Sequence, residues 1–298
     1  MILSRFHLAA FLAAAITAAP VVGESQQKVD VRRAVTRDVY VRLNGVFGSL
    51  RVTGWQKDSV VMTGSLPKEA RLEGAMGAAS STPVSGLKFY VEGPTGANAS
   101  GSLELFVPVG ATVWAKSGSA TIDVTGITGG LDLNIVGGAI TVTGDPRELN
   151  IESMDGSVMV SGAPTWMRAK TASGDVTIHG DCTDLGVTTV SGTVMIRDGT
   201  YERARIESVT GNVSFGGDMN RAGSLLMDTH SGTIELYLGK MSLDIDATTI
   251  TGTITNSVTA RRPTPGRDGR GEELTLALGT GEARATLRSF KGNIRLNR

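Results

Sequence analysis

A glycine-led motif repeats along most of this chain, and it constrains the fold more than any other feature. Each glycine is followed by an aliphatic residue or alanine at the second position and usually by another apolar residue at the fourth. Successive copies are 18 to 21 residues apart, except for a last interval of 40 residues, which we interpret as two repeats with one degenerate unit between them. Repetition at this period is typical of solenoids. The glycines are Gly118, Gly138, Gly156, Gly174, Gly192, Gly211, Gly232, Gly252 and Gly292.

Apolar residues recur at fixed distances on both sides of each glycine. In the copy that begins at Gly192, they are Val194 and Ile196 after it, and Leu185 and Val187 before it. Alternation with a period of two is typical of strands that bury one face. We therefore predict an all-β fold, a single-domain parallel β-solenoid (β-helix) with about 18–21 residues and two short strands per coil. Parallel hydrogen bonding would stack the coils about 4.8 Å apart.

Two further columns lie beside the corner that each glycine would turn. The third residue before the glycine is small and mostly hydroxylated, as at Thr189, and we expect these hydroxyls to bond along the stack in a structural role. Apolar side chains are buried by default, so we expect the second residue before the glycine to turn inward. In the alternative, this column points outward and forms a stripe for a protein or membrane contact. Its members include Val136, Met154, Ala172, Val190, Val209, His230, Ile250 and Phe290.

The first 23 residues have the three parts of a secretory signal peptide. A short basic start is followed by an apolar run from Leu8 to Ala19 and by a small-residue exit that ends at Gly23. A membrane anchor would need about 20 apolar residues, and no second stretch of that length follows. We predict a signal peptide at residues 1–23, a β-solenoid domain at residues 24–298 without a transmembrane segment, and an exported protein of the periplasm, cell surface or extracellular space.

Two segments interrupt the repeat. Residues 64–101 and 261–271 are irregular and contain prolines and glycines, so we expect both to leave the rod. The ends of a solenoid expose unpaired backbone groups. We therefore expect the strands at residues 39–61 and 294–296 to serve as caps.

Charge and cysteine content narrow the functions that the chain can have. Lys and Arg number 29 and Asp and Glu also number 29, so no net field favours nucleic acid. The single cysteine, Cys182, excludes an internal disulfide. Cys182, His179 and His230 do not have the spacing of metal ligands. We expect no catalytic residues, no cofactor-binding residues, no metal ligands and no cofactor.

Parallel β-helices also carry glycan-cleaving enzymes, whose chemistry needs paired carboxylates. Four aspartates follow repeat glycines by six or seven residues, namely Asp145, Asp181, Asp198 and Asp218. Aspartate at a turn commonly bonds nearby backbone, and we favour that structural role. Stacked coils would hold two of them about 5 or 10 Å apart, so glycosidase geometry or weak calcium binding stays open as an alternative.

Several segments of the chain carry a family resemblance. They are Gly48–Trp55, Asp58–Gly64, Leu105–Ala111, the repeated Ser-Gly-x-Val motif, Leu278–Gly281 and Ser289–Ile294. Over essentially the whole mature chain, the sequence resembles the DUF4097 family, described as adhesins with a β-strand repeat. The resemblance implies an exported or envelope location, and it brings no catalytic residues.

The expected function follows from a long rod with one wet face. That face is rich in Thr, Ser, Asn and Asp, which suit many weak polar contacts. We predict a non-enzymatic, adhesin-like interaction or scaffold protein of the cell envelope or surface, which binds an envelope glycan or a protein partner and no nucleic acid. The alternatives are a carbohydrate-active enzyme on the same rod and an envelope-stress accessory or sensor protein. The oligomeric state stays open.

Overall fold

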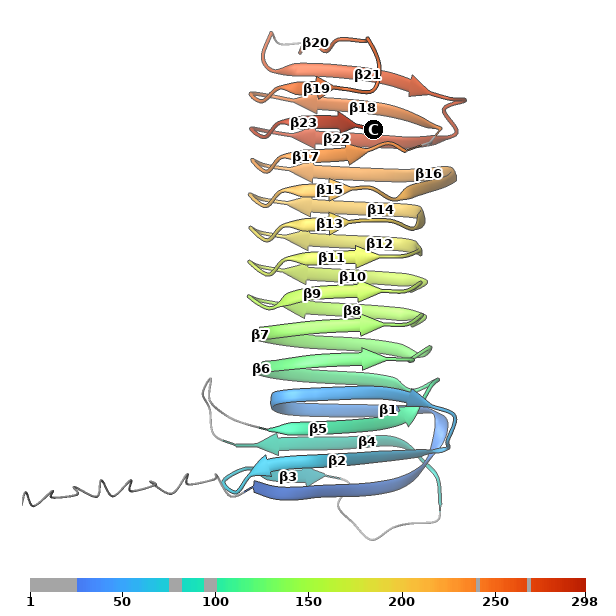
Figure 1. The fold of residues 1–298 in the computed structure, drawn as a ribbon, viewed down its shortest axis with the longest axis vertical. Helices are drawn as coiled ribbons and strands as arrows, with labels where there is room; N and C mark the ends of the chain where they lie inside the picture. Colours follow the sequence, from blue (N-terminus) through green and yellow to red (C-terminus); the bar gives the residue numbers. More distant parts are fainter. Residues whose placement is uncertain (1–25, 75–81, 94–100, 240–241, 267–268) are drawn as a thin grey trace, which may run out of the picture.

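The computed structural model describes residues 26–74, 82–93, 101–239, 242–266 and 269–298. These residues form 23 strands in one continuous stack, and none of them lies in a helix. Figure 1 shows a rod in which flat coils lie on one another along the long axis. The parallel β-solenoid predicted from the repeat is confirmed. The predicted signal peptide at residues 1–23 lies outside the described part of the chain.

Each central coil has a longer strand, a tight corner and a shorter strand that runs back. The longer strands stack in parallel in one layer and the shorter strands in another, so that Leu149, Met167 and Leu185 are partners in successive coils. The strands β6 and β7 bend through the corner and belong to both layers. The central strands are β6 (Thr112–Thr125), β7 (Gly130–Thr143), β8 (Glu148–Ser153), β9 (Ser157–Ser161), β10 (Trp166–Thr171), β11 (Val176–His179), β12 (Cys182–Thr189), β13 (Val194–Ile196), β14 (Thr200–Ser208), β15 (Val213–Phe215), β16 (Asp218–Thr229) and β17 (Ile234–Tyr237).

The core lies between the two layers. The four predicted apolar columns point into it and are buried in every coil, except at the half-buried Asn256. Among the largest buried side chains are Tyr201 and Phe215, whose ring centroids lie 5.4 Å apart. Burying one Val, Leu or Ile side chain stabilises a fold by about 1.5–3 kcal/mol, so the repeated columns hold the rod together without a disulfide.

The hydroxyl column is buried and bonded as predicted. Thr171 Oγ1 donates to Thr189 Oγ1 over 3.0 Å, and Thr229 Oγ1 donates to Ser289 Oγ over 3.1 Å, so these bonds join neighbouring coils. Within its own coil, Thr189 Oγ1 accepts the backbone N–H of Gly192 over 3.0 Å. The column thus satisfies corner backbone groups that are shielded from water.

Replacing Thr189 with valine keeps the shape of the side chain and removes the acceptor of the buried Gly192 N–H. We expect Thr189→Val to lower the free energy of unfolding by about 1–3 kcal/mol, measured by urea denaturation. The control Thr177→Val changes an outward-facing threonine of β11 and should stay within about 0.5 kcal/mol of the wild type. Unchanged stability together with lost binding would instead assign Thr189 a functional hydroxyl.

The repeat glycines stack over one another at the corner on the left of Figure 1. A Cβ added to Gly174 would overlap the carbonyl oxygen of Gly156, and the same overlap with the preceding coil recurs at Gly192, Gly211, Gly232, Gly292 and Gly252. The close approach of stacked backbone therefore requires glycine here. Gly118 is displaced from this column by two residues, because Ala120 is the partner of Gly138. A shift of two leaves the alternation of faces unchanged.

The C-terminal end departs from sequence order. Its strands are β18 (Leu243–Thr249), β19 (Ile254–Asn256), β20 (Thr264–Pro265), β21 (Glu272–Leu278), β22 (Ala283–Ser289) and β23 (Ile294–Asn297). The last coil of the chain, β22 and β23, lies between β16 and β17 on one side and β18 and β19 on the other (Figure 1).

Two expectations about this end are therefore wrong. The strand at 294–296 is not a cap, because β23 pairs on both sides, with β17 and with β19. No degenerate coil separates Gly252 from Gly292, because their coils are direct neighbours. The residues between these two glycines include β21, which pairs antiparallel with β18 and closes the end. The described residues 261–266 follow β19, and their strand β20 pairs antiparallel with β21 outside the coil of β18 and β19.

The N-terminal end shows a similar exchange of order. Its strands are β1 (Gln26–Trp55), β2 (Ser59–Pro67), β3 (Arg71–Gly74), β4 (Val84–Glu92) and β5 (Ser102–Pro108). Residues 40–53 of β1 pair with β6 on one side, and β4 and β5 lie on the other. Most of the segment 39–61 is therefore an inner coil, and the end is closed by antiparallel pairing of β2 with residues 26–34. The strand β4, which lies in the segment expected to leave the rod, pairs in parallel with β1.

Candidate functional site

Three of the four candidate aspartates bind backbone of a neighbouring coil. Asp145 Oδ1 accepts the N–H of Ala163 over 2.7 Å, and Asp181 Oδ1 accepts that of Thr200 over 2.8 Å. Asp198 Oδ1 accepts the N–H of Gly180 over 2.7 Å. These carboxylates lie in the turns that lead from a shorter strand to the next longer strand. These turns form the second corner, on the right of Figure 1, and the hydrogen bonds link each coil to its neighbour. For Asp218 the backbone N–H donates to Gly199 over 2.7 Å.

The histidines do not converge with the cysteine. His179 Nδ1 lies 3.4 Å from Asp198 Oδ2 on an exposed edge, whereas His230 stacks on Phe290 with ring centroids 5.1 Å apart. Across the residues that the structure describes, no group of three or more His, Cys, Asp or Glu side chains is placed to hold a metal ion.

Cys182 is buried, and burial is the main cause that raises the pKa of its thiol to about 11. Thiolate is the reactive form, so we expect the native protein to resist alkylation at mildly alkaline pH and the urea-unfolded protein to react quickly. Because the folded thiol keeps its proton longer, its contribution to stability is full below about pH 9 and is lost as the pH rises towards 11. Fast labelling of the native protein, followed by mass spectrometry, would contradict this burial.

A second glycine column, which is not part of the predicted repeat motif, stacks at the same corner as the aspartates. A Cβ on Gly180 would overlap the carbonyl oxygen of Gly162, and one on Gly199 would overlap that of Gly180. Gly180 also has a φ of 110°, which disfavours a side chain. The spacing of 18 residues between Gly144, Gly162 and Gly180 is visible in the sequence, and it reports structure at this corner.

The apolar corner column points outward, against the expectation that it would be core. We call it the apolar ridge; in stacking order it contains Val136, Met154, Ala172, Val190, Val209, His230, Phe290 and Ile250. All of them are exposed except the half-buried Ala172, and Met154 and Val190 expose 54% and 51% of their surface. The hydroxyl residue takes the inward place at the corner, so strand alternation puts the next residue outside.

Two shallow hollows lie beside the ridge on the outer side of the longer strands. One, of about 540 Å³, lies near His230 and Phe290, and the other, of about 450 Å³, lies near Val136 and Met154. Hydroxyl-column residues such as Thr189 line these hollows. Charged side chains one position before them on the longer strands line the hollows as well. An apolar stripe rimmed by polar groups is typical of a protein contact surface.

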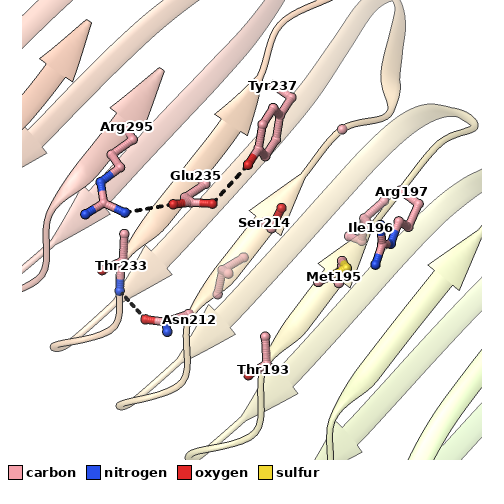
Figure 2. A pocket seen from close by; sticks show the side chains of 12 residues that line it. Thr193, Met195, Ile196, Arg197, Asn212, Ser214, Thr233, Glu235, Tyr237 and Arg295 are labelled. Carbon is pink, nitrogen blue, oxygen red and sulfur yellow. Dashed lines mark hydrogen bonds and ion pairs between the residues drawn. The ribbon is translucent and has the colours of Figure 1, made fainter. Parts of the chain in front are cut away.

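A third hollow, of about 700 Å³, lies on the outer side of the shorter strands (Figure 2). It exists because Ser214 and Gly216 of one coil are small, whereas the coils on either side carry Met195, Arg197 and Tyr237. The inserted strand β23 supplies a further lining residue, Arg295 (Figure 2), which sequence order would not place beside β17.

The third hollow is polar but lacks paired carboxylates. Glu235 binds Arg295 Nη1 over 2.9 Å and accepts the hydroxyl of Tyr237 over 3.1 Å (Figure 2). The hydrogen bond to Glu235 raises the pKa of Tyr237. Glu235 is the one carboxylate among the described lining residues, so this hollow can offer hydrogen bonds but not the two-carboxylate arrangement of glycoside hydrolysis.

Comparison with known proteins identifies the family to which the chain belongs. No curated protein matches the chain. A solved structure, described as that of a candidate cell adhesion protein from Clostridium sporogenes ATCC 15579, covers 92% of this chain and 98% of its own, with 9% identity and a TM-score of 0.21. So low a TM-score carries no argument. Within the described ranges, no helix has the length and hydropathy that spanning a bilayer demands. The family described as Toastrack DUF4097 matches residues 22–297, and the chain therefore belongs to it.

Proposed function

We propose that this protein is a non-enzymatic interaction or scaffold protein of the cell envelope or surface, which contacts a protein partner through the apolar ridge. The observation that carries the proposal is the exposure of one apolar column over consecutive coils. Scattered exposed apolar residues are normal on soluble proteins, but a continuous stripe with a polar rim marks a contact.

The occupied carboxylates support a role without catalysis. Asp145, Asp181 and Asp198 each accept a backbone N–H, and Glu235 is held by Arg295 and Tyr237. A glycosidase would need two carboxylates free to face a substrate. The ridge, in contrast, leaves large apolar side chains without a covering element among the described residues.

Cross-linking in intact cells that export the protein tests the proposal. We expect a cross-linked complex with wild-type protein and its loss with Val209→Asp, which puts a charge at the middle of the ridge. The matched control Met159→Asp changes a residue that is as exposed as Val209 but lies outside the ridge, and it should keep the complex. Equal behaviour of the two variants would contradict the proposal.

A glycan-turnover assay tests the enzymatic alternative separately. Purified protein is incubated with envelope polysaccharides, and reducing ends are followed over time. We expect no product. Product formation that is lost in an Asp198→Asn variant would overturn the proposal and turn attention to the aspartates of the second corner.

A further inference from the structure

We infer that the partner of the apolar ridge is a second copy of this chain, bound antiparallel about a two-fold axis that crosses the ridge between Val190 and Val209. The inference rests on the proposed function, because it names the partner of the same surface. It is carried by the order of charged and apolar side chains along the ridge. A two-fold interface must be self-complementary, so this order can be tested against the symmetry.

Two rows of side chains flank the ridge. The strand-side flank, two residues before each ridge residue, reads in stacking order Asn134, Glu152, Lys170, Thr188, Glu207, Asp228, Arg288 and Thr248. The loop-side flank, one residue after each ridge residue, reads Gly137, Asp155, Ser173, Ser191, Thr210, Ser231, Lys291 and Thr251. From Asp155 to Thr251, each loop-side N–H donates to the carbonyl of the ridge residue in the preceding coil, which fixes the register of the row.

The antiparallel axis matches opposite charges in both flanks. The axis lies in the interface and is perpendicular to the rod. It therefore sets each flank against the same flank of the second copy, in reverse order. On the strand side, Lys170 then faces Asp228, and Glu152 faces Arg288. On the loop side, Asp155 faces Lys291. The remaining positions face one another with at least one uncharged member, so no like charges meet.

Other arrangements bring like charges together. Moving the axis by half a coil, onto Val190, sets Glu152 against Asp228. Moving it onto Val209 sets Lys170 against Arg288. A parallel dimer sets the two flanks against each other within the same coil, so that Glu152 meets Asp155 and Arg288 meets Lys291. Like charges across an interface disfavour binding, so charge selects the antiparallel register.

The ridge is also complementary in size under this axis. The stacked rings of His230 and Phe290 make one half of the ridge bulky, and they face Ala172 and Met154 in the other copy. Methionine adapts its shape to an aromatic ring and contacts it favourably through sulfur. At the centre Val190 faces Val209, so two identical side chains meet there.

The contact area fits a weak, reversible dimer. At about 4.8 Å per coil, the ridge from Val136 to Ile250 is about 34 Å long. With a width of about 15 Å, each copy would bury roughly 500 Å², which puts the total near the lower limit of about 1,000 Å² for specific interfaces. We therefore expect a dissociation constant in the micromolar range, seen by sedimentation equilibrium of the purified exported protein.

Disulfide trapping tests the geometry directly. In the antiparallel dimer, residue 154 of one copy faces residue 290 of the other, whereas two copies of residue 154 lie about 24 Å apart at the stacking distance of the coils. We expect a mixture of Met154→Cys and Phe290→Cys proteins to form a mixed disulfide dimer, and neither variant to do so alone. Cys182 is buried and does not interfere. Disulfides within each variant alone would indicate a parallel dimer and overturn the inference.

Charge reversal tests the register. Asp155→Lys sets two lysines against each other in the antiparallel dimer, and we expect it to weaken association at least about tenfold. The double variant Asp155→Lys with Lys291→Asp should restore the wild-type dissociation constant. In a parallel dimer Asp155→Lys would instead face Glu152 and strengthen binding. That result, or failure of the double variant to restore binding, would contradict the register.

Failure of this inference can be told apart from failure of the proposed function. A purified protein that stays monomeric at high concentration, together with a cellular complex that depends on Val209, would overturn the dimer and leave the contact surface intact. A monomer whose cellular complexes ignore Val209→Asp would overturn both. A dimer that Val209→Asp dissociates and Met159→Asp does not supports both.

Discussion

Truncation of the chain after Gly281 is expected to unfold the C-terminal end of the rod from β18 onwards and to leave the central coils folded. The deleted coil contributes buried side chains that include Leu287, Ile294 and Leu296. At about 1.5–3 kcal/mol each, their burial amounts to roughly 5–9 kcal/mol, which is comparable with the whole stability of many domains. In a solenoid each coil contacts only its neighbours, so the loss should remain local.

The strands β18 and β19 are poorly suited to take the vacant place. If they moved onto β16 and β17, Asn256 would have to replace Leu296 beside Leu236 in the core. Asn256 instead binds the turn that follows it, because its Nδ2 donates to Thr259 Oγ1 over 2.9 Å and to the carbonyl of Arg261 over 2.8 Å. Burying an amide without partners costs about 1–3 kcal/mol.

Hydrogen exchange followed by mass spectrometry measures the effect of truncation. We expect β18, β19 and β21 to lose protection, while β8 to β13 keep it. Adding a peptide of residues 282–298 in trans should restore the protection, because the peptide can fill the space between the two coils. Protection of β18 and β19 in the truncated protein without the peptide would show that they have moved onto β16 and β17.

The sequence predicts which face each residue presents much better than which coil it neighbours. Alternation places Val187, Ile206 and Leu287 inside, and even the displaced alignment at Gly118 keeps every face correct. The order of coils is different, because Ile245 with Ala247 and Ala285 with Leu287 present the same inward pattern. Nothing local tells which pair lies next to β16, so the insertion of β22 could not be predicted.

The period-two alternation of the strands, followed through the corner, predicts the outward position of the apolar ridge. With Thr189 inward, the same period of two puts Val190 outward, but the usual burial of apolar residues favoured the opposite interpretation. A column that is apolar at an outward position is the informative case. The hollow at Ser214 and Gly216 was beyond reach, because it depends on the register of three coils and on Arg295 from the inserted strand.

At the repeat glycines, the space that a side chain would need is filled by the backbone of the adjacent coil. A Cβ at residue 192 would overlap the carbonyl oxygen of Gly174, and no rotation of a side chain can relieve that contact. The coils could separate only by breaking hydrogen bonds such as that from Ser191 N to Ala172 O at 2.8 Å. We expect Gly192→Ala to lower the free energy of unfolding by about 3 kcal/mol, at the upper end of the range for overpacked cores.

Two other glycines provide controls for Gly192→Ala in urea denaturation. Gly118 begins a copy of the same sequence motif, yet a Cβ there meets nothing within 4 Å, so Gly118→Ala should change stability by less than about 0.5 kcal/mol. At Gly186 the nearest atoms belong to the side chain of Arg168 and not to backbone, so Gly186→Ala should cost less than Gly192→Ala. A large loss at Gly192 alone would show that the repeat preserves glycine for backbone approach. Similar losses at Gly192 and Gly118 would instead mean that the motif requires the conformational freedom of glycine.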